Sequence, residues 1–175
     1  IRDRKLDVVG AQEVANINMY NDVNGLLSEY GMTSDTTSSD VCSYRQNPIL
    51  YKKDKLRLIS QGCFMISPKD YLGKVVDGRG SFRRDTTWAL LEEIVSGNTF
   101  YIFNTHLDGK FQEVNEYGAS TLISKIADTN KTSLPAFVTG DFNSSKTGGN
   151  TVDAQFISAG AKNCIKLTPK QMRSG

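Results

Sequence analysis

Three short polar segments of the sequence carry side chains that could bind a divalent cation and a phosphate together. Each follows an apolar run that reads as a buried strand, and the segments are Gln12-Glu13, Asn104-Thr105-His106-Leu107-Asp108 and Gly140-Asp141-Phe142-Asn143. Sheet proteins commonly bind ligands where strands open onto loops. Two carboxylates, an imidazole and an amide that face one crevice offer oxygen ligands to a hard cation and hydrogen-bond donors to a phosphate.

Each of these residues also has a purely structural explanation. Glu13 could pair with a surface cation or cap a helix. The segment from Gly140 to Asn143 could form an Asx turn after a strand, because Asp and Asn side chains bond to nearby backbone groups in such turns. A lone histidine such as His106 is more often structural than catalytic. The order and spacing of the three segments therefore carry the functional interpretation, rather than any one residue.

The composition excludes several other kinds of site. His106 is the only histidine, so a multi-histidine metal site is excluded. Cys42, Cys63 and Cys164 lie far apart without a Cys-x-x-Cys motif, which argues against a zinc knuckle or a thioredoxin-type redox pair. Three free thiols, or one disulfide and one free thiol, both remain open. No Gly-x-Ser-x-Gly segment is present, which argues against a serine hydrolase.

Length and composition indicate a single folded domain over residues 1–175. A compact chain of this length buries about 70% of its unfolded surface, which is enough for a core. The chain is 38% hydrophobic and 23% charged, unlike a disordered protein. No apolar run approaches the roughly 20 residues that span a bilayer. The net charge of +2 is too small to indicate nucleic-acid binding by itself.

The elements that must position the polar segments alternate irregularly along the chain. Apolar runs and β-forming residues predict strands at 6–10, 48–51, 56–62, 86–95, 99–104 and 136–139. Ser96-Gly97-Asn98 indicates a β-hairpin between the fourth and fifth of these. Helical spacing predicts helices at 19–30, ended by Gly31, at 114–127, and at 153–159, ended by Gly160. Residues 69–81 are predicted as a long surface loop. This order favours an α/β fold with a mixed sheet.

The polar segments resemble the ordered motifs of the endonuclease/exonuclease/phosphatase family, which includes pancreatic deoxyribonuclease, neutral sphingomyelinases and deadenylases. The matching segments are Asp7-Val8-Val9-Gly10-Ala11-Gln12-Glu13-Val14, Asn104 to Asp108 and Gly140 to Asn143. Arg84-Asp85-Thr86-Thr87-Trp88 also resembles a segment of the bacterial-type members. The resemblance implies a pancreatic deoxyribonuclease-like fold: α/β, a four-layer sandwich of two mixed β-sheets flanked by helices, incomplete at both termini.

The resemblance also implies an activity, the divalent-metal-dependent hydrolysis of phosphoester bonds as in a phosphodiesterase, nuclease or phosphatase. It implies that Glu13 holds a catalytic Mg²⁺ or Mn²⁺ and that Asp141 orients or deprotonates the attacking water. Asn143 would bond to the scissile phosphate and stabilise charge in the transition state. His106 would contact a phosphate oxygen or support the leaving group.

Three further residues take supporting roles by the same resemblance. Arg84 would contact the phosphate, although it could also be a solvated charge beside Arg83. Asp108 would orient His106 or support the site from behind, and Asn104 would have a similar supporting role.

The expected partner is a phosphorylated substrate, and its class stays open between a nucleic acid, a phospholipid head group and a small phosphoester. The lack of a basic stripe argues mildly against a dedicated DNA enzyme, because duplex binding draws on several Lys and Arg contacts. The sequence predicts neither a compartment nor an oligomeric state.

The family's terminal motifs are missing from this sequence. They are an Asn in a Tyr-Asn-Ile-like segment near the start, and an Asp followed by a Ser-Asp-His-like segment near the end. We expect a fragment of a longer enzyme with little or no hydrolase activity by itself, and a reduced family member is the alternative. The corresponding alternative function is a non-catalytic binding or scaffold protein on the same fold.

Overall fold

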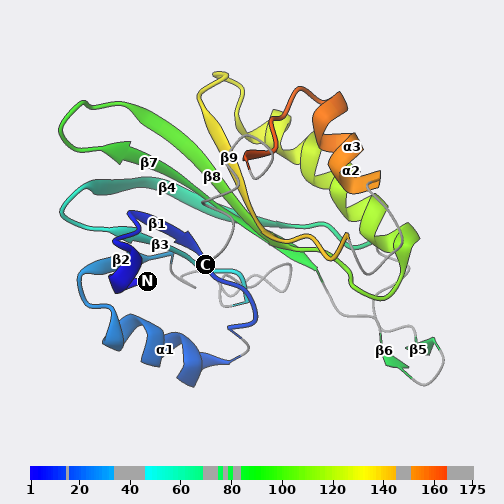
Figure 1. The fold of residues 1–175 in the computed structure, drawn as a ribbon, viewed down its shortest axis with the longest axis horizontal. Helices are drawn as coiled ribbons and strands as arrows, with labels where there is room; N and C mark the ends of the chain where they lie inside the picture. The colour runs from blue at the N-terminus through cyan, green and yellow to red at the C-terminus, as the bar shows by residue number, and fades with distance from the viewer. Residues whose placement is uncertain are drawn as a thin grey trace.

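The computed structural model describes residues 1–14, 16–33, 46–68, 75–76, 79–80, 84–144 and 151–164. In chain order, the elements are the 3-10 helix η1 (Arg2–Arg4), β1 (Val8–Gly10), α1 (Ile17–Leu26), β2 (Tyr30–Met32), β3 (Ile49–Lys52), β4 (Leu56–Met65), β5 (Val75–Val76), β6 (Arg79–Gly80), β7 (Asp85–Glu93), β8 (Thr99–His106), α2 (Gln112–Thr129), β9 (Ala136–Asp141) and α3 (Thr151–Ser158) (Figure 1).

The larger strands form two sheets. A three-stranded sheet has the order β1-β3-β2, and both of its pairings are antiparallel. A four-stranded sheet has the order β4-β7-β8-β9, with antiparallel pairs except for β8 and β9, which are parallel. The predicted hairpin is therefore confirmed as β7–β8. Of the two sheets predicted as mixed, the four-stranded one is mixed, whereas the described strands of the other are all antiparallel. The parallel pair requires a crossover, and α2 supplies it.

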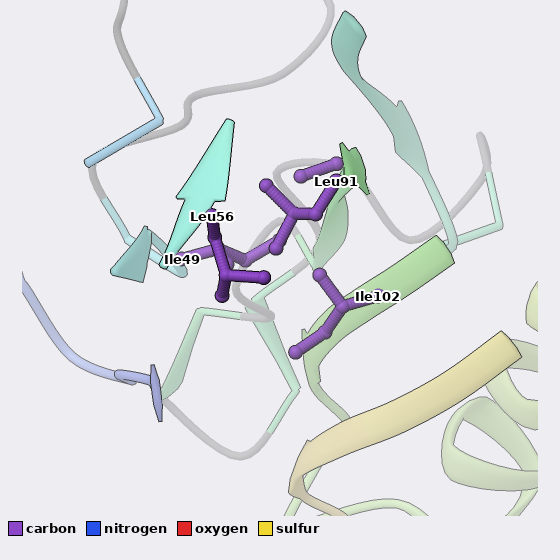
Figure 2. Packing of buried hydrophobic residues seen from close by; sticks show 5 residues of the cluster. Ile49, Leu56, Leu91 and Ile102 are labelled. Atoms are coloured by element: carbon purple, nitrogen blue, oxygen red, sulfur yellow. The ribbon is translucent and has the colours of Figure 1, made fainter. Parts of the chain in front are cut away.

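The two sheets lie face to face between helices. Figure 1 shows α1 beside the three-stranded sheet, and α2 and α3 over the outer face of the four-stranded sheet. One apolar cluster lies between the sheets and includes Ile49, Leu56, Leu91 and Ile102 (Figure 2). A second cluster lies under α2 and α3 and includes Ile66, Leu107 and Leu122. The predicted four-layer sandwich is thus confirmed.

The face of β7 and β8 that looks toward the three-stranded sheet changes character along its length. Successive side chains of a strand point to opposite faces, so every second residue belongs to this face. We call Ala89, Leu91, Phe100 and Ile102 the apolar half, because they pack in the first cluster. We call Asp85, Thr87, Asn104 and His106 the polar half. The change falls between two neighbouring cross-strand pairs, Ala89–Ile102 and Thr87–Asn104.

The helix predicted at 19–30 is shorter in the structure, where α1 ends at Leu26. Tyr30 and Gly31 belong instead to β2, so the prediction that Gly31 ends a helix is wrong. Tyr30 is buried as a strand residue. Its apolar side chain therefore belongs to the strand, and its match to the helical spacing is a coincidence. Gly31 lies opposite Tyr51, and a Cβ there would collide with the Tyr51 ring.

Two other predictions are refined by the structure. Within 69–81, which was predicted as a loop, β5 and β6 pair as a short antiparallel ladder, and the remaining residues lie outside the described ranges.

Cys63 is disulfide-bonded and Cys164 is a free, exposed thiol, so the chain contains a disulfide rather than three thiols. In the part of the chain that the structure describes, no helix is both long and apolar enough to cross a bilayer.

Candidate functional site

The candidate site lies at the carboxyl ends of β8 and β9. These strands are parallel neighbours, so their ends meet at one edge of the sheet, where His106 and Asp141 stand opposite each other in register. His106 Nε2 lies 3.8 Å from Asp141 Oδ2. The imidazole is largely buried, whereas half of the Asp141 side chain is exposed. Two of the predicted catalytic residues are therefore brought together, with the carboxylate on the solvent side.

Gly140 makes this approach of the two strands possible. Its φ is +151°, a conformation that side-chain-bearing residues rarely adopt. A Cβ at this position would collide with the backbone carbonyl of Thr105. The glycine that precedes Asp141 is thus required by the close contact between β9 and β8.

Asn143 completes a turn directly after β9. Its backbone N–H donates to Asp141 Oδ1 at 3.0 Å, and its φ is +49°. Its side-chain amide Nδ2 donates to the Leu107 carbonyl at 3.0 Å. The structure therefore contains the Asx turn that was the structural explanation of this segment. The same turn places Asn143, which is 7% exposed, beside the loop that follows His106.

Arg84 connects the acidic residues of the site. Its side chain is largely buried, and its Nε lies 4.0 Å from Asp108 Oδ2. Burial lowers the pKa of Arg84, while the charges of Asp108, Asp141, Glu13 and Asp85 act to raise it. Glu13 and Asp141 come from segments far apart in sequence, and both are near enough to act on this one guanidinium. The predicted metal ligand and the predicted base thus both lie within electrostatic range of Arg84.

The backbone around Arg84 fixes its position between β4 and β7. Its N–H donates to Ser67 Oγ at 2.7 Å, and its carbonyl accepts from the backbone N–H of Ile66 at 2.9 Å. Residue 84 therefore sits where the ladder of the two strands ends.

Glu13 lies in the loop after β1. Its side chain is exposed, and its φ of +62° is in the left-handed region, which is uncommon for a residue other than glycine. The loop is fixed on both sides, because Ala11 N–H donates to the Pro48 carbonyl and Val14 N–H donates to the Gln46 carbonyl. A residue held in a sparsely populated conformation by its surroundings is typical of functional sites.

Asn104 ties this loop to the four-stranded sheet. Its Nδ2 donates to the carbonyls of Ala11 at 2.8 Å and Pro48 at 3.1 Å. Its Oδ1 accepts from Gln12 Nε2 at 2.6 Å and from Thr139 Oγ1 at 3.1 Å. Asn104 is fully buried, so the structure gives it a supporting position beneath the loop that carries Glu13.

Asp108 is bonded to the start of the crossover. Its Oδ1 accepts from the backbone N–H groups of Lys110 and Phe111, both at 2.8 Å. Its Oδ2 faces Arg84. Asp108 thus lies between the start of the crossover and Arg84, and its supporting role stays a prediction.

Two asparagines in the site were not identified from the sequence. Asn47 Nδ2 donates to Asp85 Oδ1 at 2.7 Å and to the Asp85 carbonyl at 3.2 Å. Asn115 Nδ2 donates to the carbonyls of Asp108 and Phe142. Asn115 did have a signal, because it is a polar residue on the apolar face of a predicted helix. Asn47 stands in a loop without periodicity and had none.

The donor set of the site fits a hydrated hard cation. Within the described ranges, no three His, Cys, Asp or Glu side chains form a group that could hold a metal by themselves. Mg²⁺ does not need such a cage, since it usually keeps several waters and binds through one or two carboxylates. The exposed carboxylate of Glu13 meets that requirement.

Neither a protein-family model nor a curated protein matches the sequence. Solved structures do match. A mannosyl-6-phosphatase from Bacteroides thetaiotaomicron is 25% identical with a TM-score of 0.72, over 91% of this chain and 58% of that one. A Bacteroides vulgatus endonuclease/exonuclease/phosphatase is 28% identical with a TM-score of 0.68, over 93% and 60%.

A further endonuclease/exonuclease/phosphatase family protein from Bacteroides thetaiotaomicron is 25% identical with a TM-score of 0.66, over 81% of this chain and 51% of that one. The chain thus spans between 51% and 60% of the length of these three structures.

Proposed function

Since the chain has the fold of the endonuclease/exonuclease/phosphatase family, we propose that it acts as a divalent-metal-dependent hydrolase of phosphoester bonds. The observation that carries the proposal is the convergence of three distant segments. Asp141 lies 3.8 Å from His106, and the charges of Asp141 and Glu13 both act on Arg84.

In this reaction Asp141 is the base that orients the attacking water and accepts its proton. Half of its side chain is exposed, so water can reach the carboxylate. Its Oδ1 accepts the Asn143 N–H, which fixes the orientation of the carboxylate and leaves Oδ2 facing His106. A base held within hydrogen-bond reach of the proton that it removes contributes typically about 10²–10⁴-fold to a rate.

His106 and Arg84 serve the phosphate. Hydroxide attack adds negative charge to the phosphoryl oxygens, and fixed donors that face this charge stabilise the transition state. His106 donates to a phosphoryl or leaving oxygen. Arg84 lies beside the same carboxylates and supplies a permanent positive charge.

The charge balance of the site supports the need for a metal ion. Four carboxylates, those of Asp108, Asp141, Glu13 and Asp85, act on the charge of Arg84, so an anionic substrate would meet negative charge there. Mg²⁺ or Mn²⁺ held by Glu13 would supply positive charge to the phosphate.

The substrate class is proposed from the neighbours. One of the similar structures is a mannosyl-6-phosphatase, so a sugar phosphate is the first substrate to test. The panel also contains a nucleic acid and a phospholipid head group. The net charge of +2 gives no electrostatic reason to prefer a polyanionic substrate over a small one, so all three classes are tested.

The test is a phosphoester panel on the full-length protein with Mg²⁺, Mn²⁺ or a chelator. We expect turnover of at least one substrate with a metal and none with the chelator. Glu13→Gln should raise the metal concentration needed for half-maximal rate, and Asp141→Asn should lower kcat by about 10²–10⁴-fold. Asp54→Asn, in the exposed turn between β3 and β4, is the matched control and should behave as the wild type.

Full activity in chelator, or wild-type kinetics in Asp141→Asn, would refute this proposal. Binding of phosphorylated ligands without any turnover would favour the non-catalytic binding protein instead.

A further inference from the structure

Asn115 is a polar residue on the buried face of α2. The other buried residues of this face are apolar, and they are Val114, Gly118, Ala119 and Leu122. The Asn115 side chain is 0% exposed. Burial of an amide costs free energy unless its polar groups are hydrogen-bonded, so the partners of Asn115 must explain its place in the helix.

Those partners are the backbones of two different loops. Asn115 Nδ2 donates to the Asp108 carbonyl at 2.6 Å and to the Phe142 carbonyl at 2.9 Å. Asp108 follows His106 by two residues, and Phe142 directly follows Asp141. One amide group therefore connects α2 to the loop after β8 and to the loop after β9.

The two loops also bond directly to each other. Leu107 N–H donates to the Asp141 carbonyl at 2.9 Å, and Asn143 Nδ2 donates to the Leu107 carbonyl at 3.0 Å. Both bonds run from loop to loop and set the separation of the two segments. The bonds of Asn115 fix the position of these two loops relative to α2.

The helix is a rigid support for such a connection. Ala119 and Leu122 are both 0% exposed and pack with Ile66 and Leu107 in the second apolar cluster. The helix approaches so closely at Gly118 that a Cβ there would lie 3.3 Å from the Leu107 side chain. Close-packed interiors resist displacement, so a group bonded to α2 takes its position from the core.

We propose that Asn115 is a positioning residue for the phosphoester hydrolysis proposed above, on which this inference rests. Through the Asp108 and Phe142 carbonyls it holds His106 and Asp141 in one arrangement relative to the core. Its contribution comes from the amide N–H groups, because its Oδ1 has no hydrogen-bond partner in the described ranges. Asn115 acts on the reaction through the backbone of two loops.

The test compares two substitutions on the same helix face in the full-length protein. Asn115→Leu keeps the branched shape of the side chain and removes both donors. We expect kcat to fall by about 10–100-fold, since small displacements of catalytic groups have effects of this order. KM should change by less than about threefold, because substrate binding depends less on this geometry than the transition state does. Asn115→Ala, which admits water to the two carbonyls, tests the same point if the leucine variant does not fold.

Leu122→Ala is the matched control, because Leu122 is equally buried and contributes packing alone. All variants are assayed well below their Tm, so that the folded fractions are equal. The Tm of Leu122→Ala should fall at least as far as that of Asn115→Leu, while its kcat stays within about threefold of the wild type.

A second measurement does not depend on turnover. Amide hydrogen exchange at Leu107 and Asn143 reports local opening of the two loops. We expect faster exchange at both amides in Asn115→Leu than in Leu122→Ala.

The inference is overturned if the two variants lose kcat in the same proportion to their loss of Tm, or if exchange at the two amides is unchanged by Asn115→Leu. A wild-type protein that turns over no phosphoester would refute the proposed function instead. In that case the exchange measurement alone decides whether Asn115 holds the loops.

Discussion

The layer between the two sheets has an apolar half and a polar half, although the same strands, β7 and β8, run through both. In the apolar half, Ala89 and Leu91 are 0% exposed and pack against the three-stranded sheet without hydrogen bonds from their side chains. In the polar half, Asn104 is equally buried and makes four side-chain hydrogen bonds. Burial is thus the same in both halves, and the means of stabilisation differ.

The two halves of the layer therefore contribute differently: the apolar half to the stability of the fold, and the polar half to the candidate site. Apolar contacts are non-directional, so their stabilisation depends mainly on the area removed from water and on volume. Hydrogen bonds of buried groups are directional, and a lost partner leaves the other group unsatisfied. The candidate site therefore occupies the half of the layer where side chains such as Asn104 and Asp85 are held by directional hydrogen bonds, and the apolar half provides the burial that keeps the sheets together.

The largest effect is expected at the backbone of the polar half. Gly140→Ala should destabilise the protein by more than about 4 kcal/mol or prevent folding, because a Cβ collides with the Thr105 carbonyl and the φ is +151°. Urea unfolding measures the change. Gly25→Ala in α1 is the matched control, since nothing lies near its Cβ, and it should stabilise the protein by about 0.5–1 kcal/mol. Similar unfolding midpoints for both variants would contradict the role given to Gly140.

A cavity in the apolar half should reduce stability but spare the reaction. Leu91→Ala removes a fully buried side chain and should lower the free energy of unfolding by about 2–5 kcal/mol. The kcat per folded molecule should stay near that of the wild type. A strong fall in kcat at equal folded fraction would show that the two halves are not separable.

A substitution in the polar half should impair the reaction more than it reduces the stability of the fold. Asn104→Leu keeps the branched shape but removes the bonds to Ala11, Gln12 and Pro48, and we expect a loss of about 2 kcal/mol. The loop that carries Glu13 is then released, so the metal concentration needed for half-maximal rate should rise. Metal titration of the rate, with Leu91→Ala as control, measures this. An unchanged metal requirement would show that Asn104 does not support the residue that holds the metal.

The smallest effect is expected at the surface, outside both halves. Glu29 pairs with Arg2, and this bonding lowers the pKa of Glu29 to about 2 from its usual 4.5. Because the folded pKa is the lower one, the pair stabilises the protein above pH 4.5, and this contribution is lost as the pH falls toward 2. Glu29→Gln should lower the Tm slightly at pH 7 and not at all near pH 2, and high salt should reduce the difference. A Tm difference that persists at the lowest pH would have another cause.

The predictions that succeeded depend on signals carried by neighbouring residues. Apolar spacing located α2, and Gly97 with its neighbours located the β7–β8 hairpin, because both elements are stabilised largely by local contacts. The polar segments around His106 and Asp141 were identified because each lies at the end of its strand. Residues that lie at the end of a strand can therefore be placed in the fold from the sequence alone.

What the sequence did not predict depends on contacts between distant segments. Asn47 gave no signal from its own neighbours, and the polar character of Asn115 on an apolar helix face did not reveal its place in the site, since their partners Asp85 and Phe142 lie far along the chain. The burial of Arg84 follows from how β4 and β7 end, which no local pattern records. The early end of α1 has the same origin, because pairing with β3 draws Tyr30 into a strand.

The parallel pairing of β8 with β9 also has a consequence for the order of folding. The β7–β8 hairpin joins neighbouring segments, whereas β9 can join the sheet only after the long crossover through α2 has closed. Contacts across long stretches of chain form slowly, because the entropy of closing the loop opposes them. We therefore expect His106 to be in place before its partner arrives, so that a refolding molecule recovers most of its secondary structure earlier than its competence for chemistry.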